Sequence, residues 1–353
     1  RILCGWRVAV FALLSASLSP WAFQWARLTC DDPTLYPCAV VWGTFFLLRS
    51  GCKWNAIAAG GCFSIALYAY PAARLMIPLF LVALLLLRKI PAILAFAATL
   101  CICCIPLVVC IFNGQLLARY QQIALFSSAG SHELGTSNFL YKTWIVGRNF
   151  ASQFSASYLF VSGDRELWRA TGFCGQLSWL DILAVFLAAL LLLRYLRAGG
   201  TLRVPLVLLI VIAGLASSVL PSALTLDQSP NSLRAVGAWP FFCLFTGFIL
   251  GRAVERWRAV LLAAPIVALL FAVFFWRDYF TEYSRYAGSK FEVPAQELAR
   301  QAQHTGDWNP FLIYIRPLDR PLGQYYLLTY GHRTVAQTYQ MLPEPQIPFQ
   351  MKQ

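Results

Sequence analysis

Long apolar runs, separated by short polar segments, fill most of the chain up to residue 276. A helix needs about 20 mostly apolar residues to cross the hydrocarbon core of a bilayer. About nine runs approach this pattern, and we expect the shorter ones to extend into the flanking loops. The predicted helices cover residues 6–24, 35–48, 56–70, 75–87, 91–112, 177–193, 204–220, 235–250 and 259–276.

Two longer stretches, 113–176 and 277–353, lack this pattern. In the second, residues 294–303 have apolar positions at helical spacing, and 307–310 have the composition of a turn. The apolar run 311–315 is typical of a short buried strand. The chain is therefore predicted to be an all-α polytopic membrane domain over 1–276, with a long loop at 113–176, followed by a small α/β tail over 277–353.

The composition supports a lipid environment for these helices. Hydrophobic residues make up 59% of the 353 residues and charged residues 12%, whereas soluble domains average about 45–50% and about 25%. A chain of this size cannot bury so large an apolar fraction away from water. We therefore expect an integral membrane protein surrounded by membrane lipids.

The positive charges gather in every second connection between the predicted helices. If the helices alternate in direction, all of these connections lie on one side, which the positive-inside rule makes cytoplasmic. This predicts a cytoplasmic N-terminus and an extracytoplasmic tail. The residues concerned are Arg1, Arg7, Arg49, Lys53, Arg88, Lys89, Arg194, Arg197, Arg203, Arg252, Arg256 and Arg258.

The net charge of +13 does not indicate a nucleic-acid partner, because the sequence has no basic surface segment interleaved with aromatic residues. Most of the 11 cysteines lie in apolar runs, where a thiol behaves as a small hydrophobic group. Cys30 and Cys38 flank a short polar loop on the predicted outer side. They form a disulfide only if that side is oxidising, and the sequence leaves this open.

The predicted outer side carries four polar groups that are candidates for chemistry. In the first, Arg27 ends the first predicted helix, and Asp31 and Asp32 follow at once. Paired carboxylates hold a divalent cation, or one of them acts as a base. The alternative is a solvated loop in which Asp32 caps the next helix ahead of Pro33.

Two further groups place arginines at the predicted outer interface. Tyr70 and Arg74 flank a proline that ends one predicted helix, and Arg234 enters another from the outer side. A guanidinium in such a place binds a phosphate through two parallel hydrogen bonds. The alternative is an aromatic belt with arginines that extend to the interface.

The remaining group is a predicted turn at Gly163, followed by Asp164 and, further on, Arg169. It is either a carboxylate set among arginines for chemistry or an ordinary surface turn. Charges gathered at one membrane face suit a lipid-linked phosphate substrate. They suit an ion channel poorly, because the helix interiors carry no string of charges, and they suit a transporter with paired broken helices only weakly.

The order and spacing of these groups resemble the polytopic glycosyltransferases of the protein O-mannosyltransferase type (GT-C fold), which include bacterial lipid A aminoarabinose transferases. The resemblance covers roughly residues 1–276. Four stretches carry it: Ser19-Pro20-Trp21 running to Arg27, Tyr68-Ala69-Tyr70-Pro71-Ala72-Ala73-Arg74, Phe160-Val161-Ser162-Gly163-Asp164 with Arg169, and Arg234-Ala235-Val236-Gly237-Ala238-Trp239-Pro240.

The resemblance implies an enzyme of the bacterial inner membrane. Such an enzyme moves a sugar from a polyprenyl-phosphate carrier to a lipid, glycan or protein acceptor on the extracytoplasmic face. The transfer inverts the configuration at the anomeric carbon of the sugar, uses a carboxylate base and is often assisted by a divalent metal ion. The implied catalytic carboxylates are Asp31 and Asp32, and the implied carrier-binding residues are Arg27, Tyr70, Arg74, Asp164, Arg169 and Arg234.

The sequence also departs from the family pattern. The family commonly has about thirteen spanning helices, with its main acidic motif in the first outer loop. The helices here would correspond to the last nine or so, so we expect the main catalytic Asp to lie upstream of residue 1. Two other classes stay open, which are a non-catalytic membrane subunit bound to a partner chain and a transporter of a lipid-linked substrate.

Overall fold

A computed structural model describes residues 5–27, 34–49, 51–87, 91–114, 123–166, 169–198, 204–226, 229–287, 293–315, 327 and 332. These residues are largely helical and contain no strand. Among them, Ala124 and Thr225 form one isolated antiparallel β-bridge. The chain divides into two compact units, Arg1–Tyr279 and Phe280–Gln353.

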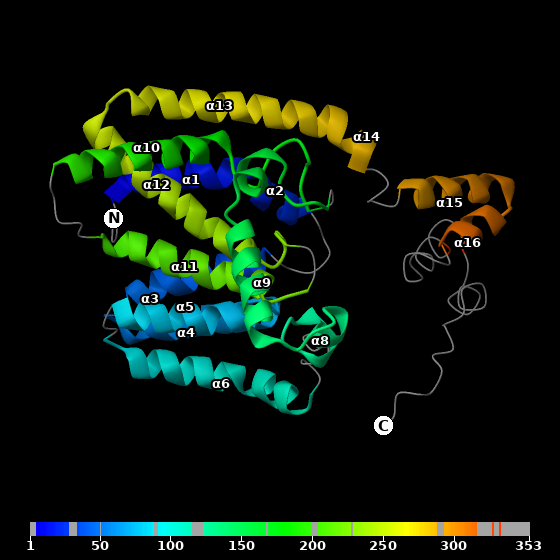
Figure 1. The fold of residues 1–353 in the computed structure, drawn as a ribbon, viewed down its shortest axis with the longest axis horizontal. Coiled ribbons are helices and arrows are strands. Elements are labelled where there is room, and N and C mark those ends of the chain that lie inside the picture. Colours follow the sequence, from blue (N-terminus) through cyan, green and yellow to red (C-terminus); the bar gives the residue numbers. More distant parts are fainter. Residues whose placement is uncertain are drawn as a thin grey trace. The chain divides into compact units, whose positions relative to one another are not determined.

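Every predicted apolar segment of the first unit contains a helix. Within this unit the helices run side by side, so that their connections gather at the two ends of a bundle (Figure 1). They are α1 (Gly5–Leu18), α2 (Pro20–Arg27), α3 (Leu35–Leu48), α4 (Lys53–Ala69), α5 (Ala73–Leu87), α6 (Ile93–Phe112), α10 (Trp179–Arg197), α11 (Leu206–Ala223), α12 (Trp239–Arg256) and α13 (Val260–Asp278).

Five helical stretches of the described residues are long and apolar enough to cross a membrane, and α1 with α2, bent by 56°, forms a sixth if counted as one span. Helices α3 and α5 are apolar but shorter. An integral membrane protein of all-α class is therefore supported, whereas the nine spans predicted from the sequence are not confirmed by the described residues. The outward face of α6 is apolar, with Ile102, Val109 and Phe112 exposed, as lipid contact requires.

Close packing of α1 against α12 depends on two glycines one turn apart. A Cβ atom on Gly247 would lie 2.6 Å from the Cβ of Ala12, and one on Gly251 would lie 2.7 Å from Cγ2 of Val8. Small residues at this spacing allow two helix backbones to approach closely within a membrane. The pairing also shows that the two helices run in opposite directions, because the later glycine faces the earlier residue.

A buried carboxylate joins α1, α10 and α12. One oxygen of Asp181 accepts hydrogen bonds from the hydroxyls of Ser15 (2.7 Å) and Thr246 (2.6 Å). The other accepts from the backbone N–H (2.8 Å) and hydroxyl (2.7 Å) of Ser178, so that Asp181 also caps α10. The apolar pattern of 177–193 gives no sign of the bonds between helices, because Ser15 and Thr246 come from helices distant in the sequence.

The stretch 113–176, predicted to be a long loop, contains helices α8 (Ser128–Glu133) and α9 (Phe139–Ser152) and the π-helical turn η1 (Ser157–Val161). The side chain of Asn138 caps α9, because its Oδ1 accepts hydrogen bonds from the backbone N–H groups of Leu140 (2.9 Å) and Tyr141 (3.2 Å). Helix α9 exposes Phe139 and Trp144 and buries Ile145. It is too short and amphipathic to match a spanning pattern, which is why the sequence did not predict it.

The second unit consists, where described, of η3 (Tyr279–Tyr283) at its start, α14 (Ser284–Ala287), α15 (Val293–Thr305) and α16 (Asn309–Ile315). Helix α15 confirms the helix predicted at 294–303. The strand predicted at 311–315 is wrong, because these residues continue α16. A short apolar run fits either period, and Pro310 near the start of the helix, with Asp307 accepting from Asn309 N–H at 3.0 Å, favours a helix. The predicted α/β tail is not supported by the described residues.

Candidate functional site

The candidate site is built from connections at one end of the bundle, where α2, α9 and the segment 229–238 lie (Figure 1); we call this the loop end. Ser19 breaks α1 from α2, and its hydroxyl caps α2 by accepting from Ala22 N–H at 3.3 Å. Trp21, two residues after Ser19, is buried, with 1% of its surface exposed. Its backbone N–H donates to Gln176 O (3.2 Å) and its indole N–H to Ser232 O (3.0 Å). Trp21 thus joins three segments that are far apart in the sequence.

Asp164 joins two of the same segments. Gly163 precedes it with φ +73°, and a Cβ there would lie 2.8 Å from Ala170 Cβ, so glycine is needed for both the conformation and the space. Asp164 is 3% exposed. One carboxylate oxygen accepts from Ser232 N–H at 2.7 Å and the other from Glu166 N–H at 3.1 Å. The turn is therefore not an ordinary surface turn, and its carboxylate holds two loops together.

The surroundings of this carboxylate are tightly packed. Tyr158 lies edge-on to Trp21, with ring centroids 5.9 Å apart. Burial and, to a smaller extent, the charge of Asp164 raise the pKa of Tyr158 well above its usual value. Burial also raises the pKa of the Cys174 thiol to about 12, although its hydrogen bond with Thr171 opposes the rise. Both groups are thus held in their neutral forms, as packing elements.

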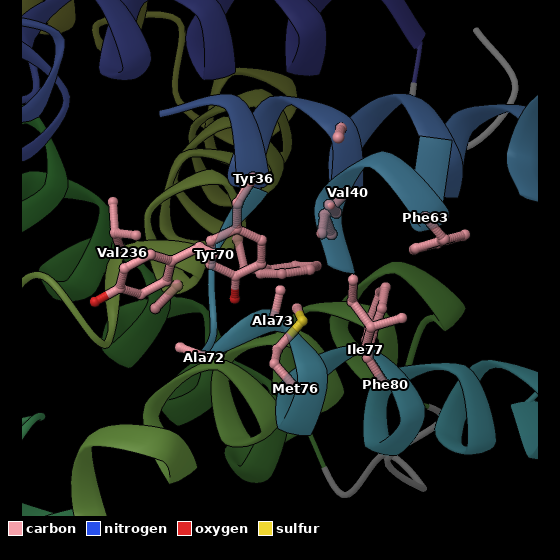
Figure 2. Packing of buried hydrophobic residues seen from close by; sticks show 14 of the residues in the cluster. Tyr36, Val40, Phe63, Tyr70, Ala72, Ala73, Met76, Ile77, Phe80 and Val236 are labelled. Atoms are coloured by element: carbon pink, nitrogen blue, oxygen red, sulfur yellow. The ribbon is translucent and has the colours of Figure 1, made fainter. Parts of the chain in front are cut away.

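Tyr36 connects the Tyr70 stretch to the Arg234 stretch. Its ring stacks with that of Tyr70 at a centroid distance of 6.2 Å and an interplanar angle of 22°. A Cβ atom on Gly237 would collide with the Tyr36 hydroxyl. Figure 2 shows Tyr36 and Tyr70 in one buried cluster with Val236. Tyr36, which is fully buried, was not predicted from the sequence; its one local signal is its position just inside the start of a short apolar helix.

The three described arginines of the site are half-buried. Arg74 donates from Nε to Leu67 O at 3.3 Å and so caps the last turn of α4. The carbonyl of Arg169 accepts from the Ser232 hydroxyl at 3.4 Å, and the backbone N–H of Arg234 donates to the Asn231 side chain at 3.2 Å. Arg169 and Arg234 are thereby both attached to the loop that Asp164 and Trp21 hold.

The structure therefore brings together residues from all four predicted stretches. Trp21 and Asp164 meet at Ser232, and Tyr70 meets Gly237 through Tyr36. The continuous segment 231–238, most of which is buried, links the two halves. Within this segment Arg234 was predicted from the sequence but Ser232 was not, since only the backbone groups of Ser232 bind Trp21 and Asp164 and any residue except proline supplies those.

The predicted catalytic residues Asp31 and Asp32 lie outside the described residues, as do Cys30 and the side chain of Arg27. Among the residues that the structure does describe, no three His, Cys, Asp or Glu side chains come together as a metal site. A divalent metal ion bound by Asp31 and Asp32 stays a prediction, and so does the pairing of Cys30 with Cys38.

Comparison with known proteins adds no family: no protein-family model, no curated protein and no solved structure matches this chain. The class defined by the structure is thus an all-α protein with several helices able to cross a membrane and a buried, multi-segment loop end.

Proposed function

We propose that this chain belongs to a membrane glycosyltransferase that moves a sugar from a polyprenyl-phosphate carrier to a lipid, glycan or protein acceptor on the extracytoplasmic face. The observation that carries the proposal is the meeting of four distant stretches at the loop end of the bundle. These are the stretches that carry the family resemblance, and Trp21, Asp164, Ser232 and Tyr36 join them by direct contacts.

Charge at the loop end supports a phosphate-bearing substrate. Arg74, Arg169 and Arg234 are half-buried there, while the Asp164 carboxylate is taken up by two backbone N–H groups. Guanidinium groups bind phosphate through charge-assisted, often bidentate hydrogen bonds. In the proposal these arginines hold the carrier phosphate together with Arg27 and Tyr70, and an aspartate such as Asp31 or Asp32 acts as the base.

The proposal includes a membrane topology. Helices α3, α4 and α5 are shorter than a full span, and in the proposal they cross with their flanking loops, giving about nine crossings. The connections rich in arginine and lysine then face the cytoplasm of a bacterial inner membrane. The loop end and the tail face the opposite side.

The test is the binding of a polyprenyl phosphate to the full-length protein in lipid nanodiscs. Arg74→Ala and Arg234→Ala each remove a charge-assisted contact of about 1.5–3 kcal/mol, so binding weakens about tenfold or more. Arg258→Ala is the matched control, because Arg258 is exposed in the connection between α12 and α13. Thermal unfolding of each variant separates lost binding from lost folding. Unchanged binding and sugar transfer in both loop-end variants would overturn the proposal.

A non-catalytic membrane subunit is the second candidate. It is favoured by the use of Asp164, since this carboxylate braces two loops. Carrier binding without sugar transfer in the full-length protein, restored by a partner chain, would select this candidate. Movement of a lipid-linked sugar across sealed vesicles without transfer would select a transporter instead.

A further inference from the structure

A second polar feature lies at the opposite end of the same unit, where α10 and α12 finish. Figure 1 shows both of these ends on the side where α1 begins, away from α2 and α9. An open surface pocket of about 670 Å³ lies between them, and four of its lining residues are the exposed Arg194, Arg197, Arg252 and Arg256. We call it the arginine pocket.

The arginine pocket carries an excess of positive charge. Glu255 also lines it and pairs with Arg252 at 3.0 Å. Arg194 packs over the ring of Trp257 at 5.6 Å, a contact that orients its guanidinium without neutralising it. Four guanidinium groups against one carboxylate leave three positive charges around a single cavity. An anion bound between these guanidinium groups would offset their mutual repulsion and lower the electrostatic free energy of the arrangement.

Helix ends alone do not account for this gathering. A helix C-terminus favours a cation in its last turn, which explains Arg194, Arg197 and Arg256. The same effect does not explain why arginines of two different helices line one cavity, nor why Arg252, a full turn before the end of α12, points to it as well. Convergence of like charges from two elements indicates a multivalent anionic ligand such as a phosphate group.

The surface next to the arginine pocket selects the source of that phosphate. Leu191 lines the pocket itself, and Leu192, Leu193 and Leu196 of the same helix are about half or more exposed. An apolar surface that adjoins a cluster of arginines suits an amphiphile, with acyl chains along α10 and an anionic head group in the pocket. A soluble phosphate compound makes no use of these leucines.

We propose that the arginine pocket binds the phosphate head group of an anionic membrane lipid. This site is distinct from the loop end and does not depend on the function proposed for it. The bound lipid contacts the ends of both α10 and α12.

The experiment measures binding of phosphatidylglycerol to the purified full chain in neutral detergent micelles by native mass spectrometry. The variant Arg197→Gln with Arg256→Gln removes two of the four positive charges, and we expect its affinity for phosphatidylglycerol to fall about tenfold or more. Arg258→Gln makes the same kind of change in the next connection but outside the pocket, and its affinity falls less than twofold. Phosphatidylcholine binds all three proteins equally weakly.

Separate outcomes overturn the proposal. Equal affinity for phosphatidylglycerol in the double variant and the unsubstituted chain removes the pocket as a lipid site. Glycerol 3-phosphate that binds as tightly as the lipid would assign the pocket to a soluble phosphate compound instead. Thermal unfolding in the neutral detergent checks that the double variant is folded, and an Arg197→Lys with Arg256→Lys variant, which keeps the charges, restores most of the binding.

Discussion

The brace formed by Asp164 gives the sharpest test of how the loop end is held. The substitution Asp164→Ala removes the acceptor of the Ser232 and Glu166 backbone N–H groups, which lie 2.7 and 3.1 Å from its oxygens. Ser232 is fully buried whereas Glu166 is only half-buried, so water replaces the second bond but not the first. A hydrogen bond to a charged group contributes about 1.5–3 kcal/mol, and an orphaned buried donor costs a similar amount.

We therefore expect the local opening free energy of the segment 229–236 to fall by about 2–3 kcal/mol. Since about 1.4 kcal/mol is a factor of ten, amide hydrogen exchange in this segment should accelerate about 30-fold to about 140-fold. Hydrogen–deuterium exchange with mass spectrometry, on protein in lipid nanodiscs, measures the change. Asp164→Asn keeps one carbonyl acceptor and should show a smaller acceleration.

Ser162→Ala is the control for this prediction. Ser162 is exposed in the same turn and its hydroxyl bonds only within that turn, to Ser157. Exchange at 229–236 should therefore be unchanged in this variant. Unaltered exchange at 229–236 in Asp164→Ala, or an equal acceleration in the control variant, would show that Asp164 does not hold this segment.

Other parts of the structure support further predictions. Gly237→Ala places a Cβ atom against the Tyr36 hydroxyl and should destabilise the protein by about 1–3 kcal/mol. Gly61→Ala has open space around the new Cβ and should be neutral or stabilising by up to about 1 kcal/mol. Thermal unfolding in detergent compares the two variants. In the same assay Asp181→Ala, which loses four hydrogen bonds, should destabilise more than Thr246→Val, which loses one, and equal effects would contradict the network. Because the folded-state pKa of Cys174 is raised to about 12 from 9.0, the unfolded chain loses this proton first as pH rises. Its contribution to stability should thus decline from pH 9 to pH 12 and vanish in Cys174→Ala, as unfolding at a series of pH values checks.

The helices of the bundle were predictable because their signal is local. The run 35–48 was predicted with the bounds that α3 has, and the run 75–87 differs from α5 only at its start. A lipid-facing helix has to be apolar over its length, so composition alone marks it. The signal weakens where the helix is short and amphipathic, as in α9, and it misleads where an apolar run is as short as 311–315.

The candidate site was predictable in part. The charged residues of the loop end could be predicted because charge is costly near lipid. Four of them lie among the described residues at one end of the bundle: Arg74, Asp164, Arg169 and Arg234. Their partners did not stand out. Ser232 acts through its backbone, and Tyr36 looks in the sequence like any aromatic residue at the start of an apolar helix.

The apolar helices, the approximate positions of most of their ends and the positive charge of particular connections can be read from the amino-acid order. These properties follow from the period and polarity of neighbouring residues. The packing of the helices is needed to see that Trp21 and Asp164 bind the same loop, that Asp181 joins three helices, and that arginines of α10 and α12 line one pocket. Such contacts join residues more than 50 positions apart, and they arise from how the helices pack, which no local pattern encodes.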